Sequence, residues 1–181
     1  SIIRTSVRNA LLELMKTKEL ERISVKDLVE RANVSRATFY RYYESVDGVI
    51  EEIEDLFIEE MRDNSRYYLS MDFDLNDLEK AVPSILGIVH TVKKYKDFIL
   101  AVSGPFGDPR FARRAQNLFV EFYAGKLAYE GIYLKDLDIY KEYAMAGQFA
   151  VTRYYLEKRQ DLSDEEIALL MLNLLYAPFR K

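Results

Sequence analysis

The stretch NVSRATFYRYYESVDGVI, residues 33–50, decides how the N-terminal part of the chain folds. Asn33 tolerates the left-handed backbone in which many helices end, and Ser35 can cap a new helix only two residues later. The residues after Ser35 have helical spacing, which predicts a short helix over 36–43. A tight turn at Asn33 therefore separates this short helix from the residues before it.

A second helix signal lies immediately before the turn. Ser24 and Asp27 form the pattern of a capping box, and an apolar stripe follows them. The stripe consists of Val25, Leu28, Val29 and Ala32. Apolar residues at helical spacing also predict a first helix over 2–17. Two helices joined by a tight turn, with a third helix in front, are typical of a helix-turn-helix.

The two faces of the short helix differ in chemistry. Phe39 and Tyr43 are four residues apart, so they share one face and are expected to pack against the first two helices. Ala37, Thr38 and Arg41 are expected to point away from that core, with Arg36 at the start of the helix and Tyr40 on its flank. Hydroxyl and guanidinium groups on an exposed helix suit phosphates and base edges, so this face is expected to meet DNA.

Charge is distributed unevenly along the 181 residues. The net charge is −4, yet residues 1–50 hold 9 Lys and Arg against 7 Asp and Glu, and the remainder holds 17 against 23. A mildly basic N-terminal part favours an anionic partner for that part alone. The absence of cysteine excludes disulfides, zinc fingers and thiol nucleophiles, and no signal peptide or apolar span is visible. We expect a cytoplasmic protein that does not enter a membrane.

The rest of the chain also has helical periodicity and no strand pattern. A helix beginning at Ser45 and running to about 69 is followed by five more, predicted over about 76–93, 95–103, 109–130, 136–160 and 164–178. Pro83 either kinks the first of these five or marks its true start. We therefore predict an all-α protein of about nine helices. The expected domains are 1–46 and 47–181, and the polar stretch SMDFDLND, 70–77, is the clearest break in the pattern.

The segment SVKDLVERANVSRATFYRYYESVDGVIEEI, residues 24–53, resembles the DNA-binding domain of the TetR/AcrR family of transcriptional regulators. The resemblance is specific over 3–55 and looser over 56–181. It implies a three-helix DNA-binding domain and a larger helical domain for ligand binding and dimerisation. It also implies a homodimer that binds a palindromic operator on double-stranded DNA and that a small molecule modulates, with repression as the expected mode. RTSVRNALLELM, residues 4–15, is similar to a branch that includes regulators of dihydroxyacetone kinase operons.

The resemblance, with the exposed face above, gives a set of expected DNA contacts: Ser24, Lys26, Ser35, Arg36, Ala37, Thr38, Tyr40, Arg41 and Tyr42. This chain departs from the family pattern at two places. Val46 replaces a lysine that many members have at the start of the fourth helix, and Asn33 replaces a turn glycine. The structural alternative is that Tyr40 and Tyr42 pack at a domain seam and that the arginines are ordinary solvated charges.

The C-terminal part is rich in Tyr and Phe, residues that suit both a helical core and a site for a small apolar or aromatic effector. The candidates for effector contact are His90, Phe122 and Tyr123. The alternative is that all three are structural, with His90 a satisfied core or boundary residue.

Small residues alternate with large ones in YAMAGQFAVTRYYL, and IALLMLNLLYAPF is apolar on nearly all sides. A helix that is apolar all round must be covered on more than one side. We expect part of the cover to be a second copy of the protein, through Ala146, Gly147, Ala150, Tyr154, Leu170 and Leu174. The alternative is complete burial within the same domain.

Other classes of function fit the sequence less well. An enzyme is not expected, because the chain has one histidine, no glycine-rich phosphate loop and no spaced metal-ligand set; no cofactor or metal is expected either. A carrier of hydrophobic ligands would leave the helix-turn-helix unexplained. A regulator controlled by a protein partner, in place of a small molecule, stays open.

Overall fold

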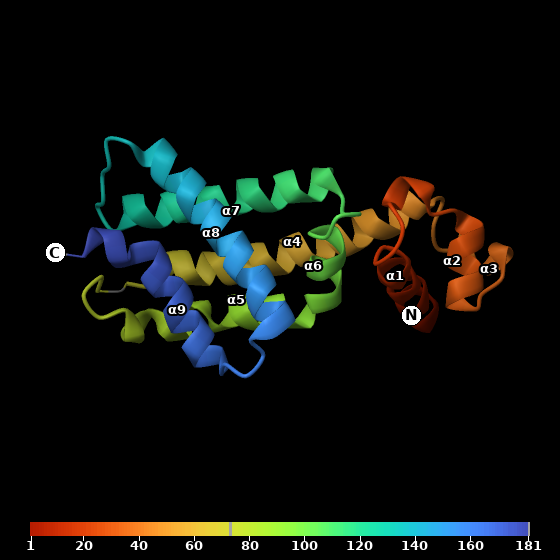
Figure 1. The fold of residues 1–181 in the computed structure, drawn as a ribbon, viewed down its shortest axis with the longest axis horizontal. Helices are drawn as coiled ribbons and strands as arrows, with labels where there is room; N and C mark the ends of the chain where they lie inside the picture. Colours follow the sequence, from red (N-terminus) through yellow and green to blue (C-terminus); the bar gives the residue numbers. More distant parts are fainter. Residues whose placement is uncertain (73, 181) are drawn as a thin grey trace. The chain divides into compact units, whose positions relative to one another are not determined.

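The computed structural model describes residues 1–72 and 74–180, and this part of the chain is helical. The α-helices are α1 Ile2–Leu14, α2 Val25–Ala32, α3 Arg36–Tyr40, α4 Val46–Ser70, α5 Val82–Lys94, α6 Lys96–Val102, α7 Pro109–Tyr129, α8 Leu137–Lys158 and α9 Asp164–Tyr176 (Figure 1). Short 3-10 helices cover Leu20–Arg22, Leu78–Ala81 and Ala177–Phe179. Within 1–72 and 74–180 the only β-type pairing is an isolated bridge between Asp74 and Asp77. The predicted all-α fold of about nine helices is confirmed.

The local signals read from the sequence act as expected. Ser24 and Asp27 form a complete capping box at the start of α2, and Ser163 and Glu166 form another at the start of α9. Asn33 ends α2 with φ 54° and ψ 48°, which is the left-handed region. These features depend on residues at most three positions apart, which is why a sequence can specify them without knowledge of the tertiary structure.

Three helix boundaries differ from the prediction by three residues or more. α1 ends at Leu14, three residues earlier than expected, and α3 ends at Tyr40. The amide of Tyr42 donates to the carbonyl of Phe39, three residues back, so the last turn tightens and the chain can leave the helix. α5 begins at Val82 after a 3-10 turn, so Pro83 marks the start of the helix and does not kink it.

The chain divides into two compact units. The N-terminal unit comprises residues 1–58 and 97–113, and the helical body comprises 59–96 and 114–181. The expected domain boundary at residue 46 remains a prediction.

The N-terminal unit has its own core. Val7 and Leu11 of α1, Leu28 of α2 and Phe39 of α3 are fully buried. α1 packs against α2, and α2 against α3. A second group of rings, Phe57, Phe98 and Phe111, joins α4 to the segment 97–113, with centroids 4.8 to 5.6 Å apart. The three-helix platform therefore rests on contacts that leave the outer side of α3 free.

The helical body packs α9 against α5 and α8, as Figure 1 shows. Ile167, Leu172 and Tyr176 lie on the buried side of α9, whereas Leu170 and Leu174 are 46% and 52% exposed. Within residues 1–72 and 74–180, α5 and α8 cover the buried side of this apolar helix and leave Leu170 and Leu174 half exposed. No helix in residues 1–72 and 74–180 combines the length and apolar character needed to cross a bilayer.

Candidate nucleic-acid interface

The first element of the candidate interface is the N-terminus of α2. The Ser24 hydroxyl accepts from the amide of Asp27 at 3.1 Å, and the Ser24 amide donates to the Asp27 carboxylate at 2.8 Å. Lys18 also donates to that carboxylate at 2.8 Å. Hydrogen bonds from Lys18 and from Ser24 lower the pKa of Asp27. Lys26, in the first turn, is exposed and lies 4.0 Å from Glu30, a distance that leaves its ammonium available to a phosphate.

The second element is the turn into α3. Ser35 caps α3, since its hydroxyl accepts from the amide of Thr38 at 3.0 Å, and it also donates to the hydroxyl of Thr38 at 2.9 Å. Thr38 is half-buried, and its hydroxyl accepts from Ser35. Its expected contact with DNA remains a prediction. The cap fixes the direction of the first turn of α3.

α3 and its C-cap Arg41 carry five of the nine predicted contact residues, and four of these are exposed. Arg36, Ala37 and Arg41 are exposed, and Tyr40 is 55% exposed. Phe39, between them, is fully buried. Tyr42, in the turn that follows, is half-buried. The expectation that Phe39 and Tyr43 are structural agrees with their burial, and the guanidinium groups of Arg36 and Arg41 lie on the surface.

Side-chain contacts of Glu52, on α4, lie behind this face of α3, and the sequence did not predict them. The carboxylate of Glu52, on α4, accepts from the hydroxyl of Tyr43 at 2.5 Å and from Arg4, and the guanidinium of Arg8 lies 3.7 Å away. We call Arg4, Arg8, Tyr43 and Glu52 the Glu52 cluster. Arg4 and Glu52 are 48 positions apart, and no local spacing rule pairs them.

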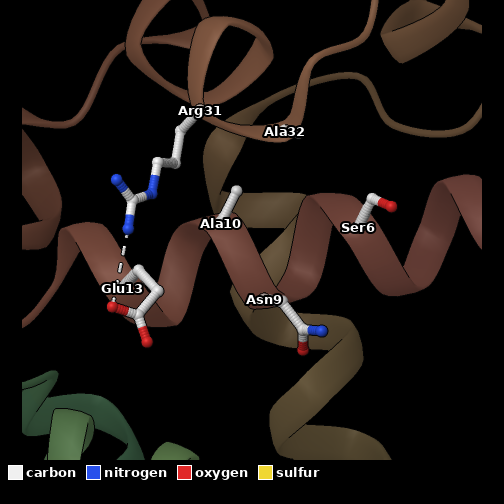
Figure 2. A pocket seen from close by; sticks show the side chains of 6 residues that line it. All are labelled: Ser6, Asn9, Ala10, Glu13, Arg31 and Ala32. Atoms are coloured by element: carbon white, nitrogen blue, oxygen red, sulfur yellow. Dashed lines mark ion pairs between the residues drawn. The ribbon is translucent and has the colours of Figure 1, made fainter.

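A shallow depression lies between α1 and α2 in the same unit, with a volume of about 290 Å³ (Figure 2). Its lining is Ser6, Asn9, Ala10, Glu13, Arg31 and Ala32. The guanidinium of Arg31 lies 3.7 Å from the carboxylate of Glu13. Because these two charges compensate each other, the depression offers little net charge to a ligand. It contains none of the predicted contacts for DNA or effector.

The three candidate effector residues of the helical body differ in exposure. Phe122 and Tyr123, on α7, are buried, and burial raises the pKa of Tyr123 to about 12. The ring of Tyr123 stacks on Phe119 with centroids 5.6 Å apart. His90, on α5, has a side chain that is 62% exposed, and its Nε2 lies 3.0 Å from the carboxylate of Asp164. His90 is therefore a surface residue, which excludes the alternative of a core or boundary residue.

The predicted dimer residues lie together on exposed surface. Ala146, Gly147 and Ala150 are exposed on α8, and Tyr154 is 60% exposed. A Cβ placed on Gly147 would meet nothing within 4 Å.

Two residues that we did not predict extend this surface along α8. Ile139 and Tyr143 are 66% and 73% exposed. Their spacing from Gly147 and Ala150 is helical, and that signal could have found them. We call the whole set the α8–α9 face: Ile139, Tyr143, Ala146, Gly147, Ala150, Tyr154, Leu170 and Leu174.

Comparison with known proteins agrees with this geometry. Residues 7–53 match the family model described as bacterial regulatory proteins, tetR family. The uncharacterized HTH-type transcriptional regulator YxbF of Bacillus subtilis (strain 168) is 26% identical over 168 residues, 90% of this chain and 42% of its own length. The HTH-type dhaKLM operon transcriptional activator DhaS of Lactococcus lactis subsp. lactis (strain IL1403) is 35% identical over 63 residues, 34% of each chain. The chain thus spans less than half the length of these relatives.

A solved structure supports the fold over nearly the whole chain. The TetR transcriptional regulator from Streptococcus agalactiae 2603V aligns with a TM-score of 0.62 and 19% identity, covering 96% of this chain and 93% of its own. At that identity the likeness concerns the fold. Residues 7–53 therefore match the DNA-binding part of the tetR family of bacterial regulatory proteins, and a helix-turn-helix lies at the N-terminus of the chain.

Proposed function

We propose that this protein regulates transcription by binding a palindromic operator as a homodimer. The observation that carries the proposal is the presentation of α3. Arg36, Tyr40 and Arg41 are exposed on one side, and Phe39 anchors the other side in the core. The DNA contacts are then the residues of α2, α3 and the following turn: Ser24, Lys26, Ser35, Arg36, Ala37, Thr38, Tyr40, Arg41 and Tyr42. Phosphate contacts from Ser24 and Lys26 orient the unit, and Arg36 reads base edges in the major groove.

The homodimer forms through the α8–α9 face. Gly147 and Ala150 allow two helices to approach closely, and Leu170 and Leu174 supply apolar surface on the helix that packs against α8. A twofold dimer presents two copies of α3 to successive major grooves, about 34 to 36 Å apart, and so requires an operator with inverted half-sites.

A small apolar or aromatic molecule that binds the helical body modulates the dimer. It changes operator affinity only if it binds one arrangement of the two DNA-binding units more tightly than another. We propose repression by operator occupancy as the mode of control. Because the relative DhaS is named as an activator, a reporter promoter that carries the operator should be assayed for both directions.

The test is selection of bound duplexes from a random pool by the purified full chain. We expect a motif with twofold symmetry. Binding to that motif should weaken with salt, with a slope of about −0.9 for each phosphate contacted. Arg36→Ala should relax preference at one base pair of each half-site if Arg36 contacts a base, and should lower the slope by about one unit per half-site if it contacts a phosphate. Failure to enrich any sequence in low salt would refute the proposal.

A further inference from the structure

The Glu52 cluster brings three separate segments of the N-terminal unit to one carboxylate. Arg4 and Arg8 come from α1, Tyr43 follows α3, and Glu52 lies on α4. The Glu52 side chain is 25% exposed. Arg4 donates to Oε1 of Glu52, Tyr43 donates to Oε2, and the Arg8 guanidinium lies near Oε2, so both oxygens of one partly shielded carboxylate are used. Charge-assisted hydrogen bonds of this kind fix geometry strongly.

Two chains of contact lead from the cluster to predicted DNA contacts. On the first, the Tyr43 ring lies 5.8 Å from the buried ring of Phe39, which meets Tyr40 edge-on at 5.4 Å. On the second, the Arg4 guanidinium lies over the ring of Tyr42, 5.6 Å from its centroid. Tyr42 thus contacts Arg4, a side chain that Glu52 holds, and Tyr40 is linked through Phe39 to Tyr43, the other side chain that Glu52 holds.

We propose that Glu52 is a positioning residue for operator recognition: through Tyr43 and Arg4 it sets where Tyr40 and Tyr42 stand, without touching DNA itself. The inference rests on the proposed function, and it adds a determinant of sequence discrimination. Its consequence is that loss of the Glu52 carboxylate reduces the preference for the operator over other duplexes more than it reduces attraction to DNA in general.

The Tyr43 hydroxyl, which donates to Glu52, keeps its proton at ordinary pH. Burial, reinforced by the hydrogen bond to Glu52, raises the pKa of Tyr43 to about 12. The phenol therefore keeps its proton throughout the range in which DNA binding is measured. Tyr43→Phe removes this one donor and leaves the ring against Phe39, so it isolates the hydrogen bond from the packing.

A comparison of two charge-changing variants of α4 distinguishes a positioning role of Glu52 from a purely electrostatic one. Glu52→Gln removes a negative charge, which by itself should strengthen binding to any duplex. Glu51→Gln, on the adjacent and exposed position of α4, makes the same change of charge outside the cluster. If Glu52 acts only through charge, the two variants behave alike. If Glu52 positions α3 and Tyr42, only Glu52→Gln loses discrimination.

The experiment measures binding of the full chain to the operator enriched by selection and to a scrambled duplex of the same length, by fluorescence anisotropy. We expect Glu52→Gln and Tyr43→Phe to lower the ratio of the two affinities about tenfold, comparable to one mismatched base pair, with the salt slope unchanged. Glu51→Gln should keep the wild-type ratio. Melting temperature and helical content, measured in parallel, confirm that the variants are folded.

Wild-type ratios for both cluster variants would overturn the inference, and so would an equal loss on both duplexes accompanied by a lower melting temperature. If Glu52→Gln does not fold, Tyr43→Phe decides alone. Failure of the wild-type chain to enrich any sequence would overturn the proposed function and this inference together. A wild-type operator with unaffected variants overturns this inference only.

Discussion

α3 and the α8–α9 pair each leave one side uncovered, and the two uncovered sides have opposite chemistry. On α3 the exposed groups are guanidiniums and a phenol, held by a capped helix start and a buried ring. On α8 and α9 they are aliphatic side chains, tyrosine rings and small residues. Exposing a polar surface to water costs little free energy, whereas burying an apolar surface against a partner lowers the free energy. The first therefore suits a hydrated anionic partner, and the second suits another apolar surface.

The largest effect is expected when charge is placed on the apolar side. Leu170→Asp combined with Leu174→Asp should weaken self-association by more than about 100-fold. Twofold symmetry places both new carboxylates in the interface twice, and each buried unpaired charge costs several kcal/mol. Light scattering coupled to size exclusion would report the mass. Lys135→Asp, at an exposed position outside this face, is the control and should leave the mass unchanged. A double variant that keeps the mass of a dimer would place the interface elsewhere.

The next largest effect tests the polar side. Tyr40→Ala should weaken operator binding about 10-fold to 100-fold, the value of one hydrogen bond to a charged group. Helical content and dimer mass should not change, because Tyr40 is 55% exposed. Tyr67→Ala removes a tyrosine of similar exposure, 51%, from α4 and serves as the control in the same anisotropy titration. Equal affinity for Tyr40→Ala and the wild type would mean that this face of α3 does not meet DNA.

The two regions also differ in how far the sequence predicts them. Caps and the turn of the DNA-binding unit depend on neighbours within three residues, so Ser24, Asn33 and Ser35 could be assigned in advance. The Glu52 cluster could not, because Arg4 and Glu52 meet only after the helices have packed. Periodicity indicates which side of a helix is buried, but it does not identify a partner from a distant segment.

The helical body shows the same limit more strongly. Lys126 lies in an otherwise ordinary amphipathic pattern, yet its side chain is fully buried, with its ammonium 3.0 Å from Glu130 and 4.9 Å from the ring centroid of Tyr129. His90 has the opposite fate, since it follows an apolar run and is exposed. The exposure of single polar residues in a bundle depends on the rotation of each helix, which a short sequence window fixes only approximately.

A smaller effect is expected at the turn that orients α3. Asn33→Ala should lower the free energy of unfolding by about 1 kcal/mol, because φ 54° brings a Cβ without a compensating polar group too close to the backbone. Asn33→Gly should change the stability by less than about half as much, since glycine adopts this conformation freely. Urea denaturation followed by circular dichroism measures both. If Asn33→Ala and Asn33→Gly are equally stable, the left-handed backbone at residue 33 does not determine the stability of the turn.

The smallest effect concerns the start of α2, and it depends on pH. Hydrogen bonds from Lys18 and Ser24 lower the pKa of Asp27 in the folded chain. A carboxyl whose pKa is lower in the folded state stabilises that state above its unfolded pKa, about 3.9, and this contribution is lost as the pH falls. Asp27→Asn should therefore lower the melting temperature by a few degrees at pH 7, and the difference should shrink below about pH 4. Glu21→Gln, an exposed carboxyl of the neighbouring 3-10 helix, is the control at both pH values. If the difference in melting temperature stays constant with pH, the Asp27 side chain stabilises the start of α2 through neutral hydrogen bonding alone. The ionic bond from Lys18 would then contribute nothing to stability.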